Sequence, residues 1–269
     1  MTLPAYAMNT ASFPEMYERL LVGPLFRPWA EALLDIVGVS AGERVLDVAC
    51  GTGIVARLAH ERLAGSGRVV AVDLSPQMLA VAQQMEPGID WREGDAAALP
   101  VGDDEPFDLV TCQQGLQFVQ DRPAAAREMR RALAPGGRLA VATWRGLDEA
   151  SFFRDLHAVA ERHLGPFIDQ RHSFGDGEAL GRLLRDAGFH DVHVRTVSRR
   201  IAFADGSVIV RMNAMAVLGM SGVAAKLAAD DRERLISEIV GDCAPVVLPY
   251  SEGPAVAFDL VSNVATARA

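Results

Sequence analysis

A short apolar segment that runs directly into two glycines constrains this chain more than any other feature. Residues 44–48 have the composition of a buried strand, and Asp47 near its end stands four positions before Gly51. Gly51 and Gly53 let the backbone turn sharply and approach a ligand, and residues 54–63 follow as a plausible helix whose N-terminus faces that ligand. The segment therefore predicts a βα unit that binds a nucleoside-type ligand in its loop.

The same segment allows two classes of ligand. Gly51, Gly53 and Ala56 satisfy the dinucleotide fingerprint G-x-G-x-x-G/A, which is typical of nicotinamide and flavin binding. However, the carboxylate of Asp47 is poorly placed beside a pyrophosphate and well placed beside a ligand that carries a sulfonium and an ammonium group. The acid therefore favours S-adenosylmethionine over a dinucleotide.

Two further acids follow later segments of the same kind. Asp73 ends the apolar run 69–73, twenty-two residues after Gly51, where a carboxylate can accept both hydroxyls of a ribose. Ser75 and Pro76 then predict a helix start, and Met78 in its first turn is placed to cover an adenine. Asp95 follows the short run 91–94 at a point where an adenine amino group could be recognised. Three acids after three separate strands make a chance arrangement improbable, although Asp47 bonded to nearby amides or Asp95 as a simple turn residue remain alternatives.

The pattern of apolar runs and helical stretches predicts the α/β class, with a Rossmann-like, doubly wound, mostly parallel seven-stranded sheet and a helical cap. A capping box at Ser12 predicts a helix that ends near Gly23 and Pro24, and a second helix is expected over 26–37. The expected division of the chain is 1–38 for N-terminal helices covering the ligand, 39–145 for the core, 146–190 for a first cap insertion, 191–203 for the sixth strand, 204–254 for a second helical insertion and 255–269 for the seventh strand.

The composition of the chain argues against several classes of function. With 26 Lys and Arg against 35 Asp and Glu, the net charge is −9, which makes a nucleic-acid partner improbable. Residues 1–9 lack the charged and apolar regions of a leader, and no apolar run is long enough to span a bilayer, so a cytoplasmic protein is expected. Three widely spaced cysteines indicate neither a disulfide framework nor a zinc site.

Several segments in order, 45–53, Asp73, 94–95, 107–112 and 133–139, resemble those of class I S-adenosylmethionine-dependent methyltransferases. The resemblance is to the small-molecule branch that includes ubiquinone and menaquinone C-methyltransferases and natural-product methyltransferases, and it is strong over residues 30–145. It implies S-adenosylmethionine as cofactor and methyl transfer to oxygen or carbon of a small, largely apolar metabolite, which can be aromatic or quinone-like. No metal is expected, because the sequence has no identifiable cluster of Asp and Asn ligands for an oxygen-loving cation. The cofactor-binding residues that the resemblance implies are Asp47, Ala49, Gly51, Gly53, Asp73, Leu74, Met78, Asp95, Ala96, Gln113 and Gln117.

The acceptor is expected beyond the ends of the fourth and fifth strands and against the cap, with Tyr17, Phe118, Trp144 and Arg145 as its candidate neighbours. The Met- and Leu-rich stretch 212–220 indicates an apolar acceptor, or else ordinary core packing. His172 is the candidate general base, because it lies in an irregular part of the first insertion; a solvated loop histidine is the alternative.

Two other functions stay open at this stage. One is a non-catalytic module that binds S-adenosylmethionine or S-adenosylhomocysteine as a regulator, and the other, which Asp47 disfavours, is a nicotinamide oxidoreductase. The nature of the nucleophile and the oligomeric state, including a homodimer, are not specified by the sequence.

Overall fold

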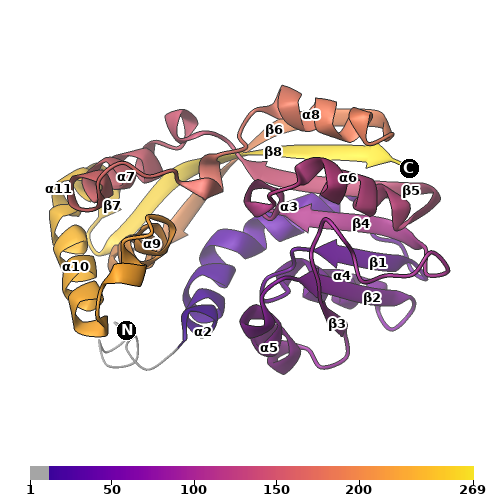
Figure 1. Ribbon diagram of the computed structural model, residues 1–269, viewed down its shortest axis with the longest axis horizontal. Coiled ribbons are helices and arrows are strands. Elements are labelled where there is room, and N and C mark those ends of the chain that lie inside the picture. The colour runs from indigo at the N-terminus through magenta and orange to yellow at the C-terminus, as the bar shows by residue number, and fades with distance from the viewer. Residues whose placement is uncertain (1–11) are drawn as a thin grey trace.

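The computed structural model describes residues 12–269, and its strands form one twisted sheet (Figure 1). The prediction that residues 1–9 are not a leader concerns residues outside the described part of the chain. The strands are β1 (Arg44–Val48), β2 (Arg68–Asp73), β3 (Asp90–Glu93), β4 (Phe107–Gln113), β5 (Leu133–Trp144), β6 (His190–Phe203), β7 (Ser251–Glu252) and β8 (Ala255–Arg268).

The order of the strands is β3-β2-β1-β4-β5-β8-β6, and the two-residue β7 pairs with β8. The first five strands are parallel, whereas β8 runs antiparallel to both β5 and β6. This confirms the mostly parallel, doubly wound α/β sheet, with β7 as a small addition to the seven expected strands. The chain moves outward in one direction from β1 and in the other from β4, so the edge beyond these two strands is the switch point where such sheets bind ligands.

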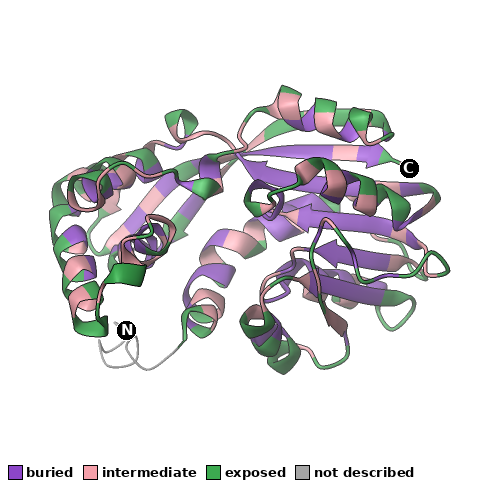
Figure 2. Ribbon diagram, in the orientation of Figure 1, coloured by how far each residue is buried: buried purple, intermediate pink, exposed green. Residues whose placement is uncertain are grey.

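Helices cover both faces of the sheet because its central strands are apolar on both sides (Figure 2). Val45 packs with one group of helices and its neighbour Leu46 with the other, as the alternation of a strand requires. The helices that pack on the first face are α3 (Arg27–Val37), α4 (Ile54–Leu63) and α5 (Pro76–Met85), and those on the second are α6 (Arg122–Arg131) and α8 (Gly177–Asp186).

The N-terminal segment differs from its expected form. The N–H of Ser12 donates to Oε2 of Glu15 at 2.8 Å, which confirms the predicted helix start. The helix does not end at Gly23 and Pro24, because α2 (Phe13–Tyr17), the π-helix η1 (Glu18–Phe26) and α3 follow one another without a break. The wider π turn relieves the clash that a proline ring makes with the preceding turn of an α-helix. The predicted pair of helices is thus one long helix beside the switch point.

The cap grows out of the sheet itself. The long strands β6 and β8 extend past β5, and their far ends carry α7 (Ser151–Leu164), α9 (Gly206–Met220) and α10 (Ala229–Asp242) (Figure 1). Phe152 of α7 stacks on Phe258 of β8 with ring centroids 4.0 Å apart, so the cap shares a core with the sheet. The remaining short helices are η2 (Leu116–Phe118), η3 (Leu147–Glu149), η4 (Gln170–His172), η5 (Ala224–Lys226), α11 (Ala244–Val247) and η6 (Leu248–Tyr250).

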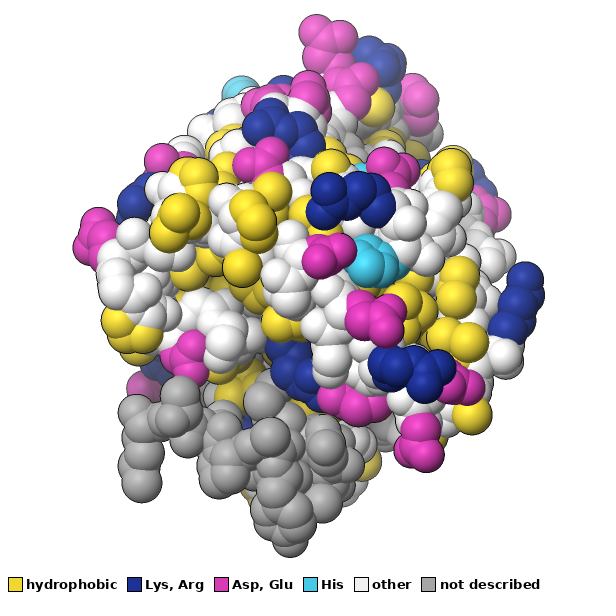
Figure 3. All heavy atoms as spheres, turned by 90° about the vertical axis from the view of Figure 1, so that its left-hand side faces the viewer, with side chains coloured by type: hydrophobic (Ala, Val, Ile, Leu, Met, Phe, Trp, Pro, Cys, Tyr) yellow, Lys and Arg dark blue, Asp and Glu magenta, His cyan; other side chains and the backbone are white. Residues whose placement is uncertain are grey.

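The outer face of the cap carries charged side chains of both signs. In Figure 3, Lys and Arg lie among Asp and Glu and do not form a patch of one sign. Between residues 12 and 269, no helix is both long and apolar enough to cross a membrane.

Candidate active site

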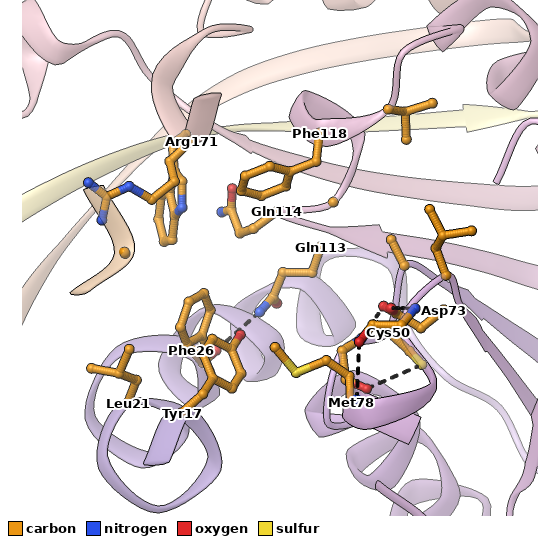
Figure 4. Close-up of a pocket in the computed structure, with 18 of the residues that line it drawn as sticks. Tyr17, Leu21, Phe26, Cys50, Asp73, Met78, Gln113, Gln114, Phe118 and Arg171 are labelled. Carbon is orange, nitrogen blue, oxygen red and sulfur yellow. Dashed lines mark hydrogen bonds between the residues drawn. The ribbon is translucent and has the colours of Figure 1, made fainter. Parts of the chain in front are cut away.

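A cavity of about 820 Å³ lies between the carboxyl ends of β1, β2 and β4 and the helices of the cap. Its position is the switch point that the strand order predicts, and its volume is in the range of small-molecule sites. Figure 4 shows Asp73, Cys50 and Met78 on one side, Arg171 on the other, and Gln113 and Gln114 between them. The cavity therefore has an acidic end at the sheet and a second end at the cap.

Asp47 lies buried at the acidic end, with 1% of its surface exposed. Its Oδ1 accepts a hydrogen bond from the hydroxyl of Thr111 at 2.8 Å, and its Oδ2 accepts one from the N–H of Ala56 at 3.1 Å. Burial raises the pKa of this carboxyl to about 7, despite the two hydrogen bonds that favour the charged form. A cationic ligand in the cavity would supply the missing counter-charge.

Asp73 ends β2 beside the loop that follows β1. Its Oδ2 accepts from the N–H of Gly51 at 2.7 Å, and its Oδ1 accepts from the N–H of Ser75 at 2.9 Å. Burial raises the pKa of Asp73 as well, and these backbone hydrogen bonds oppose that shift. Each carboxylate oxygen can accept more than one hydrogen bond, so the pair of oxygens can still receive a diol.

The third acid, Asp95, is exposed and lines the cavity next to Ala96. Its Oδ1 accepts from the N–H of Ala97 at 2.9 Å, as expected of a turn residue. Asp95 is thus a turn residue that also lines the cavity, and its recognition of an adenine stays a prediction.

The two loops at the switch point have strained backbones. Ala49 and Gln114 have φ values of 56° and 55°, which side-chain-bearing residues rarely adopt. A Cβ on Gly115 would come within 2.4 Å of the Cβ of Ala49, so the two loops approach as closely as a glycine permits. Such strain collects where a structure must hold a functional geometry.

The side chains of Gln113 and Gln114, both on the cavity wall, donate hydrogen bonds to other elements of the structure. Nε2 of Gln113 donates to the backbone oxygen of Phe26 at 3.2 Å, and Nε2 of Gln114 donates to Oγ of Ser262 at 3.1 Å. The Oε1 atoms of both glutamines are buried without a hydrogen-bond partner in the described chain. Gln113 thus connects the end of β4 to the long N-terminal helix.

Aromatic rings form much of the wall beside the cap. Tyr17 packs on Phe26 with ring centroids 4.9 Å apart, and Phe26 lies 6.3 Å from Trp144. Tyr17 lines the cavity and also packs against the apolar core. Phe118, which is 49% exposed, lines the opposite side.

His172 is buried at the cap end of the cavity, with 9% of its surface exposed. Its Nδ1 lies 2.7 Å from the backbone oxygen of Arg145, and a carbonyl oxygen only accepts, so Nδ1 carries the proton. Burial and the nearby charge of Arg171 lower the pKa of His172. The imidazole is therefore neutral near pH 7, with the lone pair on Nε2. It is not the solvated loop histidine of the alternative interpretation.

Most of the predicted site residues lie on the cavity wall. They are Tyr17, Asp47, Ala49, Gly51, Asp73, Leu74, Met78, Asp95, Ala96, Gln113, Phe118, Trp144 and His172.

Three predictions need correction. The guanidinium of Arg145 turns away from the cavity to Glu149, Gly175 and Asn263, so only its backbone oxygen contributes, through His172. Gln117 is buried away from the cavity wall. Gln114, in the loop between β4 and η2, lines the cavity instead.

Gly53 is the third correction, because it lies behind the wall and faces the ring of Trp91. A Cβ at this position would meet that ring at 2.2 Å. The absence of a side chain at Gly53 therefore lets the ring of Trp91 pack against the backbone at the start of α4.

The sequence interpretation missed the polar residues at the cap end. Arg171 and Asn213 both line the cavity, and Asp169 holds Arg171 from behind. Arg171 is next to the predicted His172, but Asn213 stands 42 positions away, within a stretch otherwise dominated by apolar residues. An asparagine inside an apolar helix was the only available signal.

Within residues 12–269, no group of three or more His, Cys, Asp or Glu side chains is arranged to hold a metal ion. The three cysteines are free and buried, and burial raises the pKa of the Cys112 thiol to about 12. These thiols therefore have the properties of small core side chains.

Comparisons with known proteins agree with this geometry. Residues 45–137 match a methyltransferase domain model. The chain is 35% identical over 187 residues to a demethylmenaquinone methyltransferase of Renibacterium salmoninarum, covering 64% of this chain and 77% of the relative. It is 30% identical over 214 residues to a ubiquinone/menaquinone biosynthesis C-methyltransferase of Dinoroseobacter shibae, covering 72% and 85%. The chain belongs to the class I S-adenosylmethionine-dependent methyltransferases.

A solved structure supports the fold of this methyltransferase. A putative methyltransferase of Bacillus halodurans superimposes with a TM-score of 0.57 at 22% identity, covering 89% of this chain and 97% of that one. The matched family segment, 45–137, contains the acidic end of the cavity, whereas His172, Arg171 and Asn213 lie beyond it. The cap end of the cavity thus lies outside the segment that matches the family model.

Proposed function

We propose that this methyltransferase holds S-adenosylmethionine at the acidic end of the cavity and transfers the methyl group to oxygen or carbon of a small, largely apolar, quinone-like acceptor at the cap end. The observation that carries the proposal is the single cavity that joins Asp47 and Asp73 to the aromatic and methionine-lined wall of the cap. The quinone-like character is supported by the names of two relatives, a demethylmenaquinone methyltransferase and a ubiquinone/menaquinone biosynthesis C-methyltransferase.

The residues at the acidic end fit the cofactor. Asp47 is a buried carboxyl group whose pKa is raised by burial, and an ammonium group beside it would favour the charged form. Asp73 has free acceptor capacity for the ribose hydroxyls, and Met78 with Ala96 borders the space for the adenine. Ala49, Gly51 and Gln113 complete the wall between these groups, with Leu74 at the rim.

When bound, S-adenosylmethionine supplies a methyl group on a positively charged sulfur. The chain contributes orientation and exclusion of water, which together can provide much of the acceleration of such a displacement. Tyr17, Phe26 and Trp144 cover the acceptor space with apolar surface. A planar aromatic acceptor fits a wall of this kind.

His172 is the general base in this proposal. Its Nε2 accepts the proton of an acidic hydroxyl or carbon, and the electron pair of the broken bond stays on the acceptor atom, which becomes the nucleophile. The backbone oxygen of Arg145 stabilises the imidazolium that forms, because it accepts from Nδ1 throughout. The proposal includes no resident metal.

The test is transfer of a labelled methyl group from S-adenosylmethionine to 1,4-naphthohydroquinone and its 2-prenyl derivative. Transfer that is unchanged by a chelator supports the proposal. Binding of S-adenosylhomocysteine without transfer to any phenol, enol or hydroquinone would instead indicate a regulatory module. Binding of NAD with no affinity for S-adenosylhomocysteine would overturn the assignment of the cavity.

A further inference from the structure

Two polar side chains at the cap end have hydrogen-bond donors from which no other residue between 12 and 269 accepts. Arg171 of η4 and Asn213 of α9 both line the cavity, among otherwise apolar neighbours such as Ile209 and Met212. Asn213 is only 3% exposed, and a buried N–H group that donates no hydrogen bond is unfavourable unless a ligand or water accepts from it. The contacts of each residue determine which donors remain.

Asp169 fixes the guanidinium of Arg171. The carboxylate is fully buried, and it accepts from Nε of Arg171 at 2.8 Å through Oδ1 and from Nη2 at 2.5 Å through Oδ2. The Arg171 charge and its hydrogen bonds hold the pKa of Asp169 below its usual value, so the pair is ionised. A two-point contact of this kind leaves the guanidinium little freedom to rotate.

The same pair fixes the orientation of Asn213. Nη2 of Arg171 donates to Oδ1 of Asn213 at 2.9 Å, so the amide nitrogen Nδ2 must point elsewhere. Neither Nδ2 of Asn213 nor Nη1 of Arg171 makes a hydrogen bond to another residue in the described part of the chain. Up to four N–H groups are therefore available at the cap end.

These donors lie beside the candidate base. Arg171 and His172 both pack against the ring of Phe153. The guanidinium carbon of Arg171 lies 5.4 Å from the centroid of that ring, and the centroid of the His172 ring lies 5.7 Å from it. His172 offers an acceptor, Nε2, whereas Arg171 and Asn213 offer only donors. The cap end thus combines one site for a proton and one site for an electron-rich oxygen.

We propose that Arg171 and Asn213 form an oxygen-binding site that selects acceptors with a second oxygen, a carbonyl or an ionised hydroxyl, near the atom that is methylated. The inference rests on the proposed function, because it assigns the substrate class of the same cavity. Asp169 is a positioning residue that acts through Arg171. Aromatic hydroxyketones, hydroxyquinones and hydroquinones have this arrangement of oxygens, whereas simple phenols do not.

The test compares two probes of similar size, 2-hydroxy-1,4-naphthoquinone and 1-naphthol. Both are titrated into the protein saturated with S-adenosylhomocysteine, and quenching of the tryptophan fluorescence, to which Trp144 on the cavity wall contributes, reports binding. The wild-type protein is expected to bind the hydroxyquinone about tenfold or more tightly than the naphthol, since hydrogen bonds to charged donors are strong in buried sites.

Two variants test which side chains cause the difference in affinity between the two probes. Arg171→Lys keeps the ion pair with Asp169 but loses the planar fork, and Asn213→Leu removes Nδ2 while leaving the ion pair in place. Each variant is expected to lose about tenfold in affinity for the hydroxyquinone and to bind 1-naphthol as the wild type does. Arg211→Lys is the matched control, because Arg211 is equally exposed at 19% but pairs with Glu233 and does not line the cavity.

The possible outcomes separate this proposal from the proposed function. If both variants lose the same factor of affinity for the two probes, Arg171 and Asn213 only support the cavity wall. If their affinity for the hydroxyquinone is unchanged, the two residues do not take part in its recognition. Either result, with S-adenosylhomocysteine still bound, overturns the oxygen-binding site and leaves the methyltransferase assignment standing. Failure of the wild type to bind S-adenosylhomocysteine would instead overturn the proposed function and, with it, this inference.

Discussion

Nδ1 of His172 lies 2.7 Å from the backbone oxygen of Arg145, and this contact defines the chemistry of the ring. It assigns the proton to Nδ1 and leaves Nε2 as a base. It also explains why Arg145, expected to contact the acceptor, acts through its backbone while its side chain binds Glu149.

His172→Gln should lower kcat by about 100-fold, because a positioned general base contributes two to four orders of magnitude. The pKa of His172 lies below the ordinary histidine value of about 6.5. The wild-type kcat should therefore still be high at about pH 6.5 and should decline only at a lower pH, where the imidazole becomes protonated. The variant should lack this acid limb while binding S-adenosylhomocysteine normally. An unchanged rate would remove His172 from the mechanism.

Asp47 makes cofactor affinity depend on pH. Its pKa of about 7 in the free protein means that part of the population is protonated near neutrality, and only the ionised form pairs with an ammonium group. Between pH 6 and pH 8 the affinity for S-adenosylhomocysteine should rise about tenfold as the carboxyl loses its proton.

Asp47→Asn is the control for this pH dependence, because the amide does not titrate. The variant should bind more weakly, with an affinity that is nearly constant over the same range. Asp73 is the nearby acid that also has a raised pKa, and a slope that persists in Asp47→Asn would assign the effect to Asp73.

Gly53 and Gly51 allow a matched test of the loop. Both have positive φ, at 86° and 57°, but only at Gly53 does an added Cβ meet another residue, the ring of Trp91. Gly51→Ala should destabilise the ligand-free protein by about 1 kcal/mol, from backbone strain alone. Gly53→Ala should destabilise it by about 3 kcal/mol, because overpacking is added.

Urea unfolding of the two variants measures these values. In a double-mutant cycle with Trp91→Leu, the effect of Gly53→Ala should shrink toward that of Gly51→Ala. Equal destabilisation of the two glycine variants with Trp91 present would show that the ring adapts without cost.

The acidic end of the cavity could be predicted because each of its acids belongs to a short local pattern. Asp47 lies near the end of β1, Asp73 ends β2 and Asp95 follows β3, and parallel strands bring their carboxyl ends to one edge of the sheet. The positions of the strands along the chain follow from the alternation of apolar runs and helical stretches.

The cap end depends on tertiary structure that no local pattern encodes. Asn213 meets Arg171 only because α9 folds over η4, and Gln114 reaches the cavity because its positive φ breaks the alternation of β4. The break expected at Pro24 was wrong for a similar reason, since packing of Leu20, Leu21 and Leu25 stabilises the π turn that contains it.

Calorimetric titration with S-adenosylhomocysteine is the most direct test of the central claim that Asp47 and its cavity bind the cofactor. The wild-type protein and the charge-matched control Asp104→Ala, whose acid is exposed and away from the cavity, should bind with micromolar affinity. Asp47→Ala should bind at least about tenfold more weakly, because it loses a charged hydrogen-bonding partner. Absence of binding to the wild type, or equal affinity in Asp47→Ala, would contradict the account.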